Sequence, residues 1–143
     1  MSLRRPSARI TVDGRELGSA EAGVQRVEVT LSADGAHDSA QVLLWPGSAF
    51  ADAAAGSSLA IALGDAGDEE TVWTGVVESV RRTPEAIRVA GLAATAKLST
   101  TYRAQAYLQQ SMADVVRDLT SGLDVDTIDA PIRFEAYHVD NQR

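Results

Sequence analysis

Residues 71–91 read TVWTGVVESVRRTPEAIRVAG and contain a long strand-forming stretch. Aromatic and β-branched residues recur from Thr71 to Arg82, which predicts one long strand. Gly75 lies inside this strand, where a glycine usually marks a bend or a bulge. The sequence Thr-Pro-Glu at 83–85 predicts a turn, and a return strand is expected over residues 87–91. A β-hairpin is therefore expected here.

Four further strands are predicted upstream of this hairpin, because apolar side chains alternate there with polar ones. They cover residues 9–12, 26–31, 40–45 and 59–63, and turn dipeptides stand at 13–14, 34–35 and 46–47. Ser48 can cap a short turn of helix that Gly56 would end. Six short strands at hairpin spacing predict an antiparallel barrel or sandwich. Long strands that are apolar on both faces favour a barrel, or an outer face that meets a neighbouring protein.

The character of the sequence changes after Ala93. Residues 94–100 are expected to form a linker or an irregular segment. Ser111 and Asp114 resemble a capping box, and apolar residues at helical spacing predict a helix over about 111–121. Alternation then predicts a strand over about 132–138. We expect a barrel domain over 1–95 and a partial α+β region over 96–143. So small a region can hardly bury its own apolar face, so a truncated fragment or a completing partner is expected.

Composition limits the possible functions. The 143 residues contain 20 Asp and Glu against 13 Lys and Arg, for a net charge of −7, and no Cys. This acidic balance argues against binding nucleic acid by neutralising phosphates and against a polybasic membrane surface. The lack of Cys excludes disulfides, thiol nucleophiles and thiolate metal sites. Neither a signal peptide nor a transmembrane stretch is expected, and membrane insertion is not predicted.

The candidate chemical residues do not form a recognisable active site. The sequence contains no Gly-rich phosphate loop and no Gly-x-Ser-x-Gly elbow. His37 and His138 are expected to be structural or solvated, because neither has the spacing of a catalytic triad or a helical zinc site. Two acidic clusters lack the spacing of a calcium loop and are interpreted as solvated. They consist of Asp65, Asp68, Glu69 and Glu70, and of Asp124, Asp126 and Asp129. No catalytic, cofactor-binding or metal-binding residue is predicted, and the chain is not expected to be an enzyme.

Two pairs of large side chains leave alternatives open. Trp45 and Trp73 are expected in the core, and a subunit contact is the alternative for one of them. Arg81 and Arg82 are interpreted as a solvated strand end, with an interchain salt bridge as the alternative.

The order of these segments resembles the N-terminal part of the phage tail protein D (late control protein) family. These are baseplate hub proteins of contractile tails, related to the hub part of the type VI secretion spike protein VgrG. Five motifs carry the resemblance along nearly the whole chain. They are residues 27–31 followed by 38–40, the Gly-ended strand 59–64, the aromatic-x-Gly-x-Val signature at 73–77, the return strand 87–91, and the helix 111–119. Residues 137–143 also resemble the stretch that precedes a further helix in full-length members.

The resemblance implies a tail-tube-like split β-barrel in a mainly β fold and a structural function without catalysis. It implies a baseplate hub that joins tail tube to spike in a phage tail or a contractile injection system. The implied partners are two further copies in a trimer, the tail tube protein and the spike protein. The implied place is the tail or baseplate of a particle that assembles in the bacterial cytoplasm.

Outer faces at subunit contacts are expected to include Leu43, Trp45, Trp73 and Val77. The acidic loop of Asp65, Asp68, Glu69 and Glu70 is a candidate for the lumen or the rim of the ring, where it would repel nucleic acid. The alternative functions are a small-ligand-binding β-barrel and, less favoured, a module associated with a cell-wall hydrolase.

Overall fold

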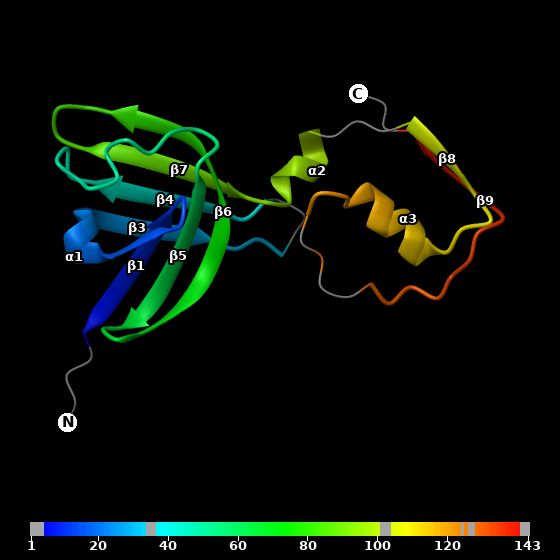
Figure 1. Ribbon diagram of the computed structural model, residues 1–143, viewed down its shortest axis with the longest axis horizontal. Helices are drawn as coiled ribbons and strands as arrows, with labels where there is room; N and C mark the ends of the chain where they lie inside the picture. The colour runs from blue at the N-terminus through cyan, green and yellow to red at the C-terminus, as the bar shows by residue number, and fades with distance from the viewer. Residues whose placement is uncertain (1–4, 34–36, 101–103, 124, 126–127, 141–143) are drawn as a thin grey trace. The chain divides into compact units, whose positions relative to one another are not determined.

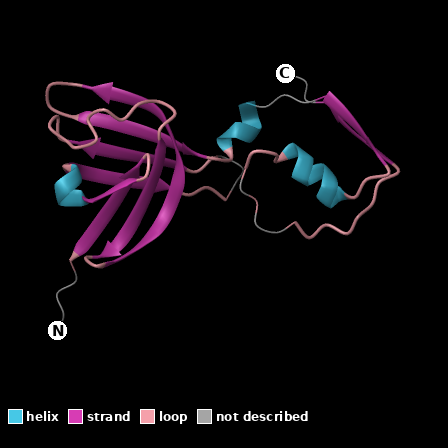
Figure 2. Cartoon of the chain, in the orientation of Figure 1, coloured by secondary structure: helices cyan, strands magenta, loops and turns pink. Residues whose placement is uncertain are grey.

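The computed structural model describes residues 5–33, 37–100, 104–123, 125 and 128–140. The chain divides into two compact units, Met1–Ala94 and Thr95–Arg143 (Figures 1 and 2). Unit 1 contains seven strands and one short helix. They are β1 (Pro6–Val12), β2 (Arg15–Gly18), α1 (Ser19–Ala22), β3 (Val24–Thr30), β4 (Ser39–Leu44), β5 (Ser58–Asp65), β6 (Asp68–Arg82) and β7 (Ile87–Ala93).

Unit 1 is one antiparallel sheet in the order β2-β1-β5-β6-β7-β4-β3. The sheet bends so that the β1 and β5 half lies across the β4 and β7 half (Figure 1). Inward side chains from both halves form a single hydrophobic cluster. Its fully buried members include Ile10, Ile61, Val42, Leu44 and Val77. The fold is thus mainly antiparallel β, with the two halves of one bent seven-stranded sheet packed over a common core.

Local sequence explains the first hairpin. Asp13 and Gly14 have φ angles of 48° and 80°, the left-handed conformations that a tight two-residue turn requires. The Asp13 carboxylate also accepts a hydrogen bond from the backbone N–H of Ser58 at 2.8 Å. The turn at 13–14 therefore fixes the register of β1 with β2 and is also anchored to the start of β5.

Two bulges reset the alternation along β6. Ile61 pairs with Trp73 while Ala62 pairs with Thr71, so Val72 is an extra residue on β6. The pairing with β7 shifts again between Val77 and Ser79. These shifts lie on either side of Gly75, where the bend or bulge is expected from the sequence.

Gly75 and Gly91 have a packing role. A Cβ atom at Gly75 would lie 2.2 Å from the Leu92 carbonyl oxygen and 2.6 Å from the Trp73 ring. A Cβ atom at Gly91 would lie 2.8 Å from the same ring. The indole therefore lies against two backbone segments that no side chain covers. The Trp73 Nε1 atom is buried there and has no hydrogen-bond partner among the described residues.

The segment 49–55 forms turns, and the short helix expected there is wrong. The Ser48 hydroxyl donates to the Ala22 carbonyl and accepts from the N–H of Phe50. The Arg82 guanidinium binds the carbonyls of Ala51 and Ala53, at 2.8 Å for its closest contact to each. The carbonyl groups of this segment accept hydrogen bonds from an arginine on a distant strand instead of from the N–H groups of a helix. The buried Phe50 ring also ties the segment to the core.

Unit 2 contains two short helices and a two-stranded antiparallel sheet. They are α2 (Ala96–Thr100), β8 (Ala104–Leu108), α3 (Met112–Leu119) and β9 (Ala136–Asp140). Ser111 caps α3, since its side chain accepts a hydrogen bond from the N–H of Asp114 at 3.2 Å. The Tyr107 hydroxyl donates to the Asp118 carboxylate at 2.6 Å and links β8 to α3. Residues 132–135, expected as the start of a strand, precede β9.

Candidate assembly interface

The outward surface of β3, β4, β7 and β6 carries a transverse row of arginines. Arg26 pairs in register with Leu43, Leu43 with Arg88, and Arg88 with Arg81. All three arginines are exposed and Leu43 is half-buried. Because directly paired residues point to the same side of a sheet, the four side chains share one face. We call this row of Arg26, Leu43, Arg88 and Arg81 the outer arginine face.

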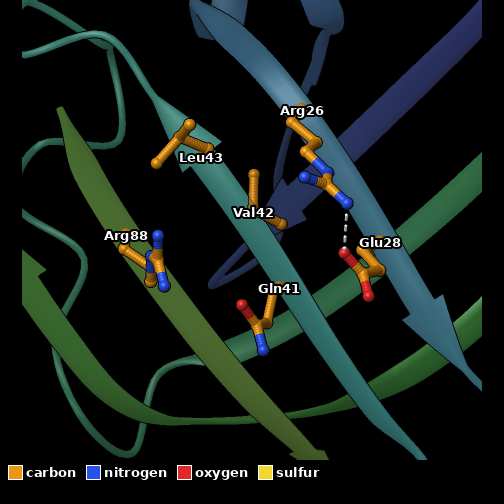
Figure 3. Close-up of a pocket in the computed structure, with 6 residues that line it drawn as sticks. All are labelled: Arg26, Glu28, Gln41, Val42, Leu43 and Arg88. Atoms are coloured by element: carbon orange, nitrogen blue, oxygen red, sulfur yellow. Dashed lines mark hydrogen bonds and ion pairs between the residues drawn. The ribbon is translucent and has the colours of Figure 1, made fainter.

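A shallow pocket of about 150 Å³ lies within this face. Arg26, Glu28, Gln41, Val42, Leu43 and Arg88 line it (Figure 3). Arg26 and Glu28 form an exposed ion pair at 2.8 Å along β3, drawn as a dashed line in Figure 3. Arg88 stands on the other side of β4 and has no ion pair or hydrogen bond within the described chain. The pocket therefore lies between the guanidinium of Arg26, which has an ion partner, and that of Arg88, which has none among the described residues.

The four predicted contact residues divide into two pairs. Trp45 is 58% exposed, so the expectation that it lies in the core is wrong. Leu43 is half-buried, and both side chains can reach a neighbouring molecule. Trp73 and Val77 are only 4% and 2% exposed and belong to the core of unit 1. The sequence alone does not show which face of the sheet Trp73 and Val77 point to, because Val72 and Val76 beside them are also apolar. On β6 it is Val72 that is exposed, at 39%.

The acidic loop is the tip of the β5–β6 hairpin, and its members behave differently. The Glu69 side chain is 6% exposed and pairs with Arg9 at 2.8 Å. Hydrogen bonds, first from the Ser7 hydroxyl and also from the Gly67 N–H and Arg9, lower the pKa of Glu69 from its ordinary 4.5 to about 2. Asp68 and Glu70 are exposed and make no ion pair with any described residue. Asp65 is exposed as well.

The neighbouring arginines Arg81 and Arg82 have separate roles. Arg82 binds the carbonyls of the 51–53 turn, whereas Arg81 belongs to the outer arginine face. Sequence reasoning singled out Arg81 but missed Arg26 and Arg88. The missing information is the register of β3 with β4 and of β4 with β7, because it brings together residues from three distant segments. The available signal was that both arginines alternate with apolar residues on their strands.

The remaining candidates that the structure describes form no cluster. His37 is half-buried before β4, and His138 is exposed on β9. Asp129 is exposed, while Asp124 and Asp126 lie outside the described residues. Over the described ranges, no group of three or more His, Asp or Glu side chains could hold a metal ion. No helix in the described part of the chain is long and apolar enough to cross a membrane.

Comparison with solved structures finds proteins of similar fold. The chain is similar to phage tail proteins. A 43 kDa tail protein of prophage MuSo2 from Shewanella oneidensis matches with a TM-score of 0.70 and 14% identity, over 95% of this chain and 44% of that one. A tail protein from Neisseria meningitidis MC58 matches with a TM-score of 0.60 and 15% identity, over 81% of this chain and 33% of that one.

A third match is a chain of the Francisella PdpA-VgrG complex. Its TM-score is 0.60 at 12% identity, over 94% of this chain and 23% of that one. The chain thus spans less than half the length of each of these three neighbours. No family model and no curated protein matches the sequence. At these identities the likeness concerns the fold, and the fold is one that tail proteins use.

Proposed function

We propose that this chain is a structural subunit of a phage tail or of a phage-tail-like contractile injection particle. Within that particle it acts as a baseplate hub that joins the tail tube to the spike, and it performs no catalysis. The observation that carries the proposal is the match to a prophage tail protein over 95% of this chain at a TM-score of 0.70. The match to a VgrG complex supports a place near the spike.

The surface of unit 1 supports a function that works through contacts. Leu43 on β4 and Trp45 directly after it offer apolar area, and two arginines, Arg26 and Arg88, lie beside Leu43. Aromatic and arginine side chains are the residues that most often anchor protein–protein contacts. We propose that Leu43 and Trp45 belong to the contact between copies in a trimer. The tail tube and spike proteins are the further proposed partners, and the bacterial cytoplasm is the proposed place of assembly.

A small-ligand-binding barrel is the alternative, and it would need a hollow interior. The space between the two halves of the sheet is occupied by large side chains, among them Ile61, Phe50 and Trp73. The pocket of about 150 Å³ lies on the outer side instead. The packing therefore favours the structural proposal over ligand binding.

Incorporation into particles tests the proposal. A tagged chain would be expressed in a strain that produces tail particles, and particles would be purified on the tag. The expected result is a tail particle with the tagged subunit at the junction of tube and spike in electron micrographs. The proposal fails if the tagged chain is recovered without any tail protein. A cell-wall lysis assay on the same protein tests the hydrolase alternative, and no lysis is expected.

A further inference from the structure

We infer that the outer arginine face of one copy binds the tip of the β5–β6 hairpin of a second copy of this chain. Arg81, Arg88 and Arg26 would meet the exposed carboxylates of Asp68 and Glu70. The inference rests on the proposed function, because it assigns the charges at a contact between subunits of one assembly. It names a docking surface and its occupant.

The first observation is the lack of compensation among the arginines. Arg81 and Arg88 are directly paired across β6 and β7. Like charges placed opposite each other on a sheet repel and destabilise it. Arg26 has Glu28 as an ion partner, but Arg81 and Arg88 have none among the described residues. A partner that brings carboxylates to this face would turn the repulsion into attraction.

The second observation is the shape of the face. Arg26 and Arg88 flank Leu43 from the two strands beside β4, so their Cα atoms are about 10 Å apart by ordinary strand spacing. The pocket of about 150 Å³ lies between them, with Gln41 in its lining. A carboxylate entering the pocket would come within reach of both guanidiniums. Arginine can bind a carboxylate through two parallel hydrogen bonds, which fixes the orientation of the partner.

The third observation is the matching group on the same chain. Asp68 and Glu70 are two residues apart on β6, so strand alternation places them on one face about 7 Å apart. Both are exposed and unpaired among the described residues. Glu69 between them forms an ion pair with Arg9 at 2.8 Å. The hairpin tip therefore presents two free carboxylates at a spacing that two neighbouring arginines can receive.

The fourth observation concerns topology. The hairpin tip lies where β5 ends and β6 begins, whereas the outer arginine face lies on β3, β4, β7 and the far end of β6 (Figure 1). Neither Asp68 nor Glu70 pairs with an arginine of the outer face within the described chain. A contact between two different patches is heterologous, and repetition of such a contact closes a ring when the rotation permits. The hairpin would then lie at the contact between subunits rather than on the lumen wall.

Charge exchange tests the inference. One variant carries Arg81→Glu with Arg88→Glu, a second carries Asp68→Arg with Glu70→Arg, and a third combines all four substitutions. The mass of each would be measured by sedimentation over a range of concentrations at low and high salt. Each of the first two variants is expected to weaken association by at least about tenfold, because like charges then meet at the contact. The combined variant is expected to recover it, and high salt to weaken the unsubstituted assembly.

A matched control carries Glu21→Arg with Asp52→Arg. It changes the net charge by the same amount as the hairpin variant, at exposed acids outside both patches. Unchanged association in this control is expected. If the two exchanges leave association unchanged, or if the combined variant fails to recover it, the inference is overturned while the proposed function stands. A chain that stays monomeric at all concentrations also overturns it, and particle incorporation then decides the proposed function separately.

Discussion

Unit 1 and unit 2 are stabilised in different ways. Unit 1 has a continuous core to which all seven of its strands contribute packed side chains, and Ile61 and Ala22 are completely buried in it. In the described part of unit 2 the buried apolar side chains are Tyr107 and Val115. Leu108, at 69% exposed, stands on the surface instead. The comparison teaches that hydrophobic burial defines unit 1, whereas hydrogen bonds such as Tyr107 to Asp118 carry more of the order in unit 2.

The largest expected effect comes from emptying the core of unit 1. Ile61→Ala removes a side chain with no exposure and should lower the free energy of unfolding by about 2–5 kcal/mol. Urea unfolding followed by tryptophan fluorescence measures it, since Trp73 is buried. The control is Leu31→Ala in unit 1, where the side chain is 65% exposed and the expected loss is under about 0.5 kcal/mol. Equal losses for the two variants would contradict the comparison.

The second prediction concerns the close approach at Trp73. Gly75→Ala places a Cβ atom against the Leu92 carbonyl oxygen and the indole ring, so we expect a loss of about 1–3 kcal/mol. Gly47→Ala is the control, because no atom lies within 4 Å of a Cβ at that position. Thermal unfolding of both variants provides the measurement. If Gly75→Ala is as stable as the control, the packing role of Gly75 is wrong.

The third prediction sharpens the description of unit 2. Tyr107→Phe removes the 2.6 Å hydrogen bond to Asp118 and should cost unit 2 about 1–2 kcal/mol, while unit 1 keeps its stability. Amide hydrogen exchange resolves the two units, and faster exchange is expected only within unit 2. Tyr137→Phe, at an exposed tyrosine, should leave the exchange unchanged. Faster exchange throughout both units would show that they unfold together.

The smallest effect is the pH dependence contributed by Glu69. The pKa of this carboxyl is about 2 in the folded chain against an ordinary 4.5. A lowered folded-state pKa adds stability above pH 4.5, and this stability is lost as the pH falls from 4.5 toward 2. Glu69→Gln should therefore flatten the acid limb of the stability curve in this window, as measured by denaturant midpoints. Glu70→Gln, at the exposed neighbour, should retain the slope, and equal slopes for Glu69→Gln and the unsubstituted chain would contradict the assignment.

Alternation in the sequence was sufficient to predict the inner face of several strands. Ala40, Val42 and Leu44 are buried as their period of two predicts, and so are Leu59 and Ile61. The strand β2 was missed because Arg15–Gly18 is short and carries little apolar signal. The turns at 49–55 were mistaken for a helix because the arginine that binds their carbonyls comes from β6.

The candidate interface was less accessible to sequence reasoning. Trp73 and Val77 stand in apolar runs, so alternation alone cannot say which neighbour faces inward, and the bulge at Val72 decides it. The outer arginine face depends on the register between β3, β4, β7 and β6. Register is a tertiary property, because it joins residues that are tens of positions apart. Leu43 lies on β4 and Trp45 directly follows it, and their place in a subunit contact stays a prediction.

The most direct test of the structural function is the mass of the chain in solution. Light scattering over a wide concentration range, with a chain of 15.1 kDa, separates monomer from trimer without ambiguity. A subunit that works by packing against copies of itself should reach about three times the monomer mass as concentration rises. A mass that stays at one chain throughout the range would contradict self-assembly as the way this protein works.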